Sequence, residues 1–211
     1  MKGHSPLRKA FLLLVPAITA VLLARHPPET DSAFDLRGDT DRWLVVHVGL
    51  LVMIPLIAIV VWMLLDGIGN GTATVSRVML VAFVGFYAAF ESMVGIGTGV
   101  LIVETDALSP ATQEGAEALT ESWWDVPMPI PIIAAAAILS WIVSLGAATV
   151  AHVRVRSPLP VVLGLGAATI LFALGHPGIT GALAMAGLFV STAVSVFGLG
   201  GDRGAARPET G

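Results

Sequence analysis

The sequence contains no cysteine and few charged side chains: Asp, Glu, Lys and Arg make up only 12% of its 211 residues. The absence of cysteine excludes disulfide bonds, thiol catalysis and metal clusters held by thiolates. Soluble domains usually contain about 25% charged residues, so the low charge argues against a water-soluble fold. The net charge of -4 excludes a strongly basic nucleic-acid-binding surface, and we expect no nucleic acid partner.

Hydrophobic residues make up 55% of the chain and give it a mean hydropathy of +0.86. A helix that crosses a bilayer needs about 20 largely apolar residues. Six stretches fit or nearly fit that length: residues 10–24, 43–65, 78–103, 128–151, 159–175 and 179–199. The sequence therefore predicts an all-α, polytopic membrane helix bundle of about six transmembrane helices, with the lipid bilayer as its partner. Residues 1–199 form this single domain, and residues 200–211 are expected to be a disordered cytoplasmic tail.

The first apolar stretch has a second interpretation. Lys2, Arg8 and Lys9 precede a short apolar core, which is the layout of a secretory signal peptide. The residues after that core, 23–28, make a poor cleavage site, so a retained helix is favoured over a removed signal.

Loop charges predict the orientation of the chain. If the N-terminus is cytoplasmic and every stretch spans, most basic residues lie inside and only Arg25, Arg37 and Arg42 lie outside. This distribution satisfies the positive-inside rule, so we expect a cell-membrane protein with both termini cytoplasmic. The two long outer loops, residues 29–41 and 104–125, are rich in Asp and Glu. These carboxylates are either simply solvated or provide a negative field that favours cations.

Glu91 is the most informative residue because it lies near the middle of the third stretch. An ionisable side chain there costs about 2–4 kcal/mol on insertion scales and usually marks a functional site. Tyr87 and Thr98 lie one and two helical turns away, on the same face, and carry hydroxyl groups. We interpret Glu91, Tyr87 and Thr98 as candidates for a substrate or proton site. The alternative is that a protonated Glu91 only donates a hydrogen bond to another helix.

Gly95 and Gly99 form a GxxxG pair just after Glu91, with Gly97 between them. Small residues at this spacing let two membrane helices approach closely. We therefore expect Gly95 and Gly99 to form a helix-packing surface. Three glycines in five residues also loosen a helix.

His47 and His176 lie near the outer ends of their stretches and are candidate metal ligands. The sequence has no HExxH motif and no close His/Asp spacing, so two interfacial histidines without a metal are the alternative. Haem would need two axial histidines on facing helices, whereas His176 is in a short link. We predict no cofactor and keep a metal ion or haem as alternatives. Helix rise places Glu91 about 10 Å deeper than His47, so their contact would require the glycine segment to bend.

Five short segments of the sequence are distinctive: residues 47–55, 76–78, 86–91, 95–99 and 174–177. Together they resemble an uncharacterised family of small multi-pass membrane proteins of actinobacterial type. The resemblance implies a bacterial membrane protein and draws attention to His47, Glu91, the Gly95–Gly99 run and His176. It implies no activity.

The sequence leaves the function open between three classes. The first is a small transporter or ion-coupled carrier that uses the buried Glu91. The second is an accessory or structural membrane subunit, in a homo-oligomer or a larger membrane complex. The third is a metal-dependent membrane enzyme with a His/carboxylate site on its outer face. The cost of burying Glu91 favours the first class, while enzyme activity stays undecided.

Overall fold

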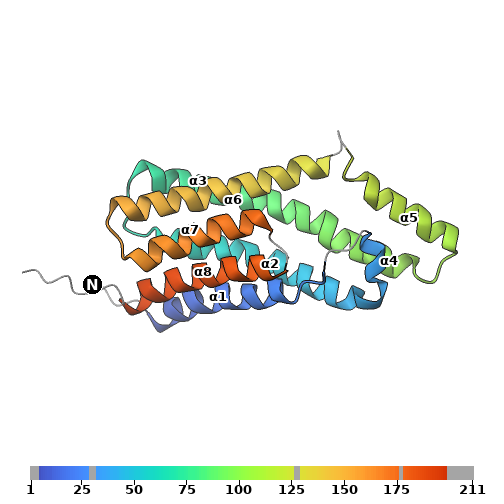
Figure 1. The fold of residues 1–211 in the computed structure, drawn as a ribbon, viewed down its shortest axis with the longest axis horizontal. Coiled ribbons are helices and arrows are strands. Elements are labelled where there is room, and N and C mark those ends of the chain that lie inside the picture. The colour runs from blue at the N-terminus through green and yellow to red at the C-terminus, as the bar shows by residue number, and fades with distance from the viewer. Residues whose placement is uncertain (1–4, 29–31, 126–128, 176–177, 199–211) are drawn as a thin grey trace, which may run out of the picture.

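The computed structural model describes residues 5–28, 32–125, 129–175 and 178–198, and these residues contain helices but no strand. Six long helical segments run along the molecule (Figure 1). Their helices are α1 (Pro6–Ala24), α2 (Thr40–Leu64), α3 (Gly71–Phe90), α6 (Pro129–Arg154), α7 (Leu159–Leu174) and α8 (Gly178–Phe197). Shorter elements complete the fold: the 3-10 helix η1 (Ala33–Asp39), the π-helix η2 (Glu91–Gly97), α4 (Thr98–Thr105) and α5 (Pro110–Ser122).

The six long segments pack in chain order and close on themselves. Each of α1, α2, α3, α6, α7 and α8 contacts the next, and α8 packs against α1. Among the described residues, five apolar segments are long enough to cross a membrane, and α7 is a shorter apolar helix of 16 residues. The prediction of an all-α polytopic membrane bundle of about six helices is confirmed.

Two of the helices, α1 and α3, begin before the predicted apolar stretches because polar residues cap their N-termini. Ser5 accepts a hydrogen bond from Arg8 N at the start of α1, and Asn70 accepts one from Ala73 N at the start of α3. Such caps satisfy backbone N–H groups that have no partner within the helix. As a result, α1 and α3 begin four and seven residues before the stretches expected at residues 10–24 and 78–103. The predicted tail, residues 200–211, lies outside the described residues.

Aromatic side chains fill the space between α3, α6 and α7. The ring of Trp141 lies 4.9 Å from that of Phe83 and 4.6 Å from that of Phe172, and all three side chains are buried. Trp141 Nε1 donates a hydrogen bond to Ala168 O at 3.1 Å, so its polar atom is also satisfied. Large apolar side chains such as Val81 and Leu163 instead face outward. Lipid can cover them, as expected for a membrane bundle.

Two segments are much longer than a bilayer is thick. Phe34–Leu64 and Gly71–Thr105 contain 31 and 35 residues, whereas α1 has 19 and α8 has 20. At 1.5 Å per residue the longest segment spans about 50 Å, against a hydrocarbon core of about 30 Å. In Figure 1, η1, α4 and α5 accordingly extend beyond α1, α7 and α8. We call this extended part of the molecule the α5 end.

Basic side chains stabilise the end of the molecule opposite the α5 end. Arg8 pairs with Asp66 at 2.5 Å and donates to Met63 O, which ties α1 to the end of α2. Arg77 Nη2 donates to Leu65 O at 2.7 Å, so it satisfies a carbonyl at the C-terminus of α2. The link between α2 and α3 is therefore held by two arginines.

The crossing of α7 and α8 gives a stability prediction. A Cβ atom on Gly164 would lie 2.4 Å from Gly187 O and 2.3 Å from Ser191 Oγ, so Gly164→Ala must push the two helices apart. We expect a loss of about 1–3 kcal/mol in the free energy of unfolding, as for other overpacked sites. Unfolding in mixed detergent micelles measures it. Gly166→Ala is the control, because its Cβ meets no atom within 4 Å on the same helix. Equal stabilities of the two variants would contradict the prediction.

Candidate functional site

The structure brings together two ionisable residues from different helices. A hydrogen bond of 2.6 Å joins His47 Nδ1 on α2 to Glu91 Oε2 at the start of η2. Both residues are buried, with 4% and 1% of their surface exposed. The expectation that Glu91 lies about 10 Å deeper than His47 is therefore wrong.

The error comes from the ends of the two segments rather than from their middles. The predicted depths of His47 and Glu91 are measured from residues 43 and 103, where the apolar stretches end. The structure continues the second segment outward to Phe34, through the polar η1 turn, and the third to Thr105. The number of residues from Phe34 to His47 differs by only one from the number from Glu91 to Thr105. The two side chains therefore lie at the same distance from the outer ends of their segments and can meet.

A π-helix positions Glu91 and the glycines after it. Residues Glu91–Gly97 adopt the π form between α3 and α4, so the Gly-rich segment departs from regular α-helix. Single π turns inside α-helices are rare and occur frequently at functional sites. The direct His47–Glu91 contact is made at this irregular turn.

Glycine allows α2 to come this close. A Cβ atom on Gly95 would lie 2.3 Å from His47 Nδ1 and 2.6 Å from Glu91 Oε2, where no atom fits. On Gly99 it would lie 2.6 Å from Leu44 Cδ2. Trp43 Nε1 also donates a hydrogen bond of 2.6 Å to Gly95 O, which ties α2 to the backbone of the π-helix. The structure thus places both glycines against α2.

Two further rings extend the site toward the end of α1. The rings of Trp43 and His47 lie 4.2 Å apart, and the ring of His26 lies 5.4 Å from Trp43 and 5.0 Å from His47. His26 follows α1 directly and is half-buried. Burial is the largest effect and lowers the pKa of His26 below its usual value, and the positive charge of Arg42 acts in the same direction. The hydrogen bond from His26 Nδ1 to Pro27 O opposes this shift.

The sequence analysis did not select His26 or Trp43 as site residues. The signal for His26 was its position two residues beyond a helix that packs beside the start of α2. The signal for Trp43 was its spacing of four residues from His47, which places both rings on one helix face. Neither signal identifies the partner ring without the packing of α1 on α2.

The pair retains unused hydrogen-bonding atoms. Among the described residues, His47 Nε2 and Glu91 Oε1 have no hydrogen-bond partner, although both atoms are buried. Buried polar atoms of native proteins are almost always bonded, so each exception requires an explanation. An imidazole and a carboxylate joined in this way can hold a proton on either group. The free atoms are available for a proton or a small polar ligand to arrive and leave.

The other predicted residues are not all part of this contact. Tyr87 is buried one turn before Glu91, and its ring packs against Phe83 and Phe172. Thr98 is buried at the start of α4. His176 lies outside the described residues, so its predicted role as a ligand stays a prediction. Within the parts of the chain that the structure describes, no three His, Asp or Glu side chains are grouped so that they could hold a metal ion.

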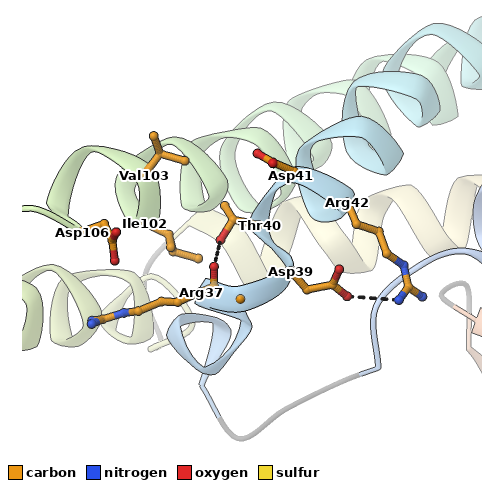
Figure 2. A pocket seen from close by; sticks show the side chains of 9 residues that line it. Arg37, Asp39, Thr40, Asp41, Arg42, Ile102, Val103 and Asp106 are labelled. Carbon is orange, nitrogen blue, oxygen red and sulfur yellow. Dashed lines mark hydrogen bonds and ion pairs between the residues drawn. The ribbon is translucent and has the colours of Figure 1, made fainter.

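A pocket of about 350 Å³ opens at the α5 end, between η1, the first turn of α2 and the end of α4. Figure 2 shows Asp39 and Arg42 together on the right, paired at 3.1 Å, while the Arg37 side chain extends to the left toward the side on which Asp106 lies. Arg37 also donates a hydrogen bond to Gln113 of α5. The pocket lies next to the rings of His26, Trp43 and His47. Arg42, which lines the pocket, precedes Trp43 in the chain and donates a hydrogen bond to the backbone of the link that carries His26.

Comparisons with known proteins add no relative to this description. No family model, no curated protein and no solved structure matches the chain. The resemblance to an actinobacterial membrane family therefore stays a prediction. The geometry of the His47–Glu91 contact is therefore the basis on which a function can be proposed.

Proposed function

We propose that this integral membrane protein is a small proton-coupled transporter, in which the His47–Glu91 pair binds the proton. The observation that carries the proposal is the 2.6 Å hydrogen bond between two side chains that are at most 4% exposed. Ionisable residues within membrane bundles are costly, pair with one another and mark proton relays and ion pathways. A buried pair is weak evidence for a contribution to stability alone, because desolvation offsets most of its Coulomb energy.

The environment of the pair supports a change of state on protonation. Adding a proton to the pair changes its charge in a region of low dielectric, where such a change has a large effect. The π-helix that carries Glu91 also contains Gly95 and Gly97, and its backbone is tied to α2 through Trp43. A change in the His47–Glu91 hydrogen bond would therefore change the position of α2 relative to the η2–α4 segment.

The same proposal includes the orientation, with both termini cytoplasmic and the α5 end outside. Arg8, Arg77 and Arg154 lie toward the end opposite α5, which agrees with the positive-inside rule. Carboxylates are frequent at the α5 end, including Asp39, Asp41 and Asp106 around the pocket. The negative field of these carboxylates raises the local concentration of protons and other cations.

The substitution Glu91→Gln tests the proton site without changing the shape of the side chain. In infrared spectra of the full chain in lipid nanodiscs, we expect a carboxyl band that changes reversibly with pH in the wild-type protein and is missing in the variant. In proteoliposomes, a pH gradient should drive uptake of a small solute from a panel of cations and zwitterions. Glu91→Gln should reduce this uptake by at least about tenfold, since it removes the proton-transfer group.

Glu104→Gln is the matched control for both measurements. Glu104 is a glutamate on the same continuous segment but is exposed near the end of α4. Its substitution should leave the pH-dependent band and the uptake unchanged. Wild-type behaviour of the Glu91→Gln variant in both measurements would overturn the proposed function.

A further inference from the structure

We propose that His26 is the relay residue that carries protons between the water at the α5 end and the His47–Glu91 pair. This inference rests on the proposed function, and it assigns a route to the proton. His26 is half-buried, whereas His47 and Glu91 are buried. The His26 ring lies 5.0 Å from the His47 ring, so it stands between the exposed surface and the pair.

The hydrogen bonds of the two rings define which atoms take part. A carbonyl oxygen can only accept, so His26 Nδ1 carries a hydrogen that it donates to Pro27 O at 2.7 Å. The neutral His26 ring therefore presents Nε2 as a lone pair. His47 uses Nδ1 for Glu91, and its buried Nε2 has no partner among the described residues. Each ring thus has one nitrogen engaged and the other available.

A proton can pass along these atoms in three steps, and each step accounts for where the proton goes. Water delivers a proton to His26 Nε2 and forms an imidazolium. His26 then gives that proton to the lone pair on His47 Nε2, through one bridging water or a small ring rotation. His47 in turn releases its Nδ1 proton to the Glu91 carboxylate. The net result is one proton taken from water and one carboxyl group formed, with both imidazoles neutral again.

The charges around His26 favour transfer over storage of the proton. Arg42 and His47 face it from α2, and Glu91 from η2 lies behind His47, while the side chain of the neighbouring Arg25 is exposed to solvent. Burial lowers the pKa of His26, and Arg42 lowers it further. Both effects favour the neutral ring over the imidazolium. A relay group needs this property, because a stable cation would hold the proton.

The backbone holds His26 in this position. Arg42 donates from Nε to Arg25 O at 2.6 Å and from Nη2 to His26 O at 3.3 Å. These bonds fix the link after α1 onto the first turns of α2. The ring contact with Trp43, 5.4 Å between centroids, supports the same placement.

The relay is tested by the rate at which protons reach the pair in the full chain in nanodiscs. After a stopped-flow jump from about pH 8 to about pH 5, which covers the titration of histidine, tryptophan fluorescence reports the change in the His47–Glu91 hydrogen bond when Glu91 takes up the proton. Trp43 lies 4.2 Å from the His47 ring, and Trp43→Phe identifies its share of the signal. His26→Ala should slow the change by at least about tenfold without reducing its amplitude. Imidazole added to the buffer should restore the rate in His26→Ala.

Two further variants separate a relay from a structural role. His26→Phe keeps a ring against Trp43 but carries no proton, so it should be slow and should not respond to imidazole. Arg25→Gln removes a neighbouring exposed charge and should keep the wild-type rate. Wild-type rates in both His26 variants, with the signal lost in Glu91→Gln, would overturn the relay while the proton site stands. Slow His26→Ala kinetics that imidazole does not restore would also overturn it. A wild-type protein without any pH-dependent signal would overturn the proton site itself.

Discussion

Replacing Gly95 by alanine is expected to break the His47–Glu91 hydrogen bond and to destabilise the bundle by about 3 kcal/mol or more. The new Cβ would lie 2.3 Å from His47 Nδ1 and 2.6 Å from His47 Cγ, so the imidazole must move. Any movement away from Gly95 also stretches the bond between Trp43 Nε1 and Gly95 O, because Trp43 is on the same helix as His47. A single methyl group therefore breaks the two hydrogen bonds, from His47 and from Trp43, that tie α2 to the π-helix.

The free energy of unfolding in mixed micelles measures this loss, and the pH-dependent infrared band should disappear in the same variant. Gly85→Ala is the matched control, because Gly85 lies on α3 and its Cβ would meet no atom within 4 Å. Alanine is a better helix former than glycine by about 1 kcal/mol, so this control should be neutral or slightly stabilised. A Gly95→Ala protein as stable as Gly85→Ala, with the band intact, would show that the pair does not depend on this glycine.

The membrane bundle could be predicted from the sequence because hydrophobicity and length decide which segments span. Every apolar stretch identified in the sequence corresponds to a helix in the structure, including the short α7. The ends could not be placed from hydrophobicity alone. The first turns of α2 and α3 are polar, and their helical form depends on caps such as Asn70 and on the η1 turn. This error at the ends produced the wrong relative depth of His47 and Glu91.

Several residues of the site could be predicted from the sequence, but the contacts between them could not. Glu91 is recognisable because a carboxyl group within a spanning segment is costly, and Gly95 and Gly99 because small residues at that spacing favour close helices. The partner of Glu91 depends on which helix packs beside it, and local sequence does not specify that. The π-helix was also beyond prediction, because glycines can loosen a helix without determining which hydrogen-bond pattern replaces it. His26 enters the site only through the packing of α1 on α2.

Replacing both members of the pair by leucine is expected to be far less damaging than replacing His47 alone. His47→Leu leaves the Glu91 carboxyl group 1% exposed and without its partner. Breaking a buried pair in this way typically costs about 3–5 kcal/mol, whereas replacing both groups by apolar side chains is often neutral or stabilising. We therefore expect the His47→Leu/Glu91→Leu protein to recover most of the stability that His47→Leu loses. A double-mutant cycle of unfolding free energies in mixed micelles measures this coupling.

Comparing the unfolding free energy of the double variant with its pH-driven uptake shows whether the pair is a proton site or only a structural contact. If the pair is a proton site, the double variant should unfold like the wild type and yet show no pH-dependent band and no pH-driven uptake. The Glu104→Gln control should be close to wild type in all three measurements, because Glu104 is exposed. If the pair only holds α2 against the π-helix, a double variant as stable as the wild type should keep its pH-driven uptake. That result would falsify the proton-site interpretation, because helix packing alone would then explain the burial of the two ionisable groups.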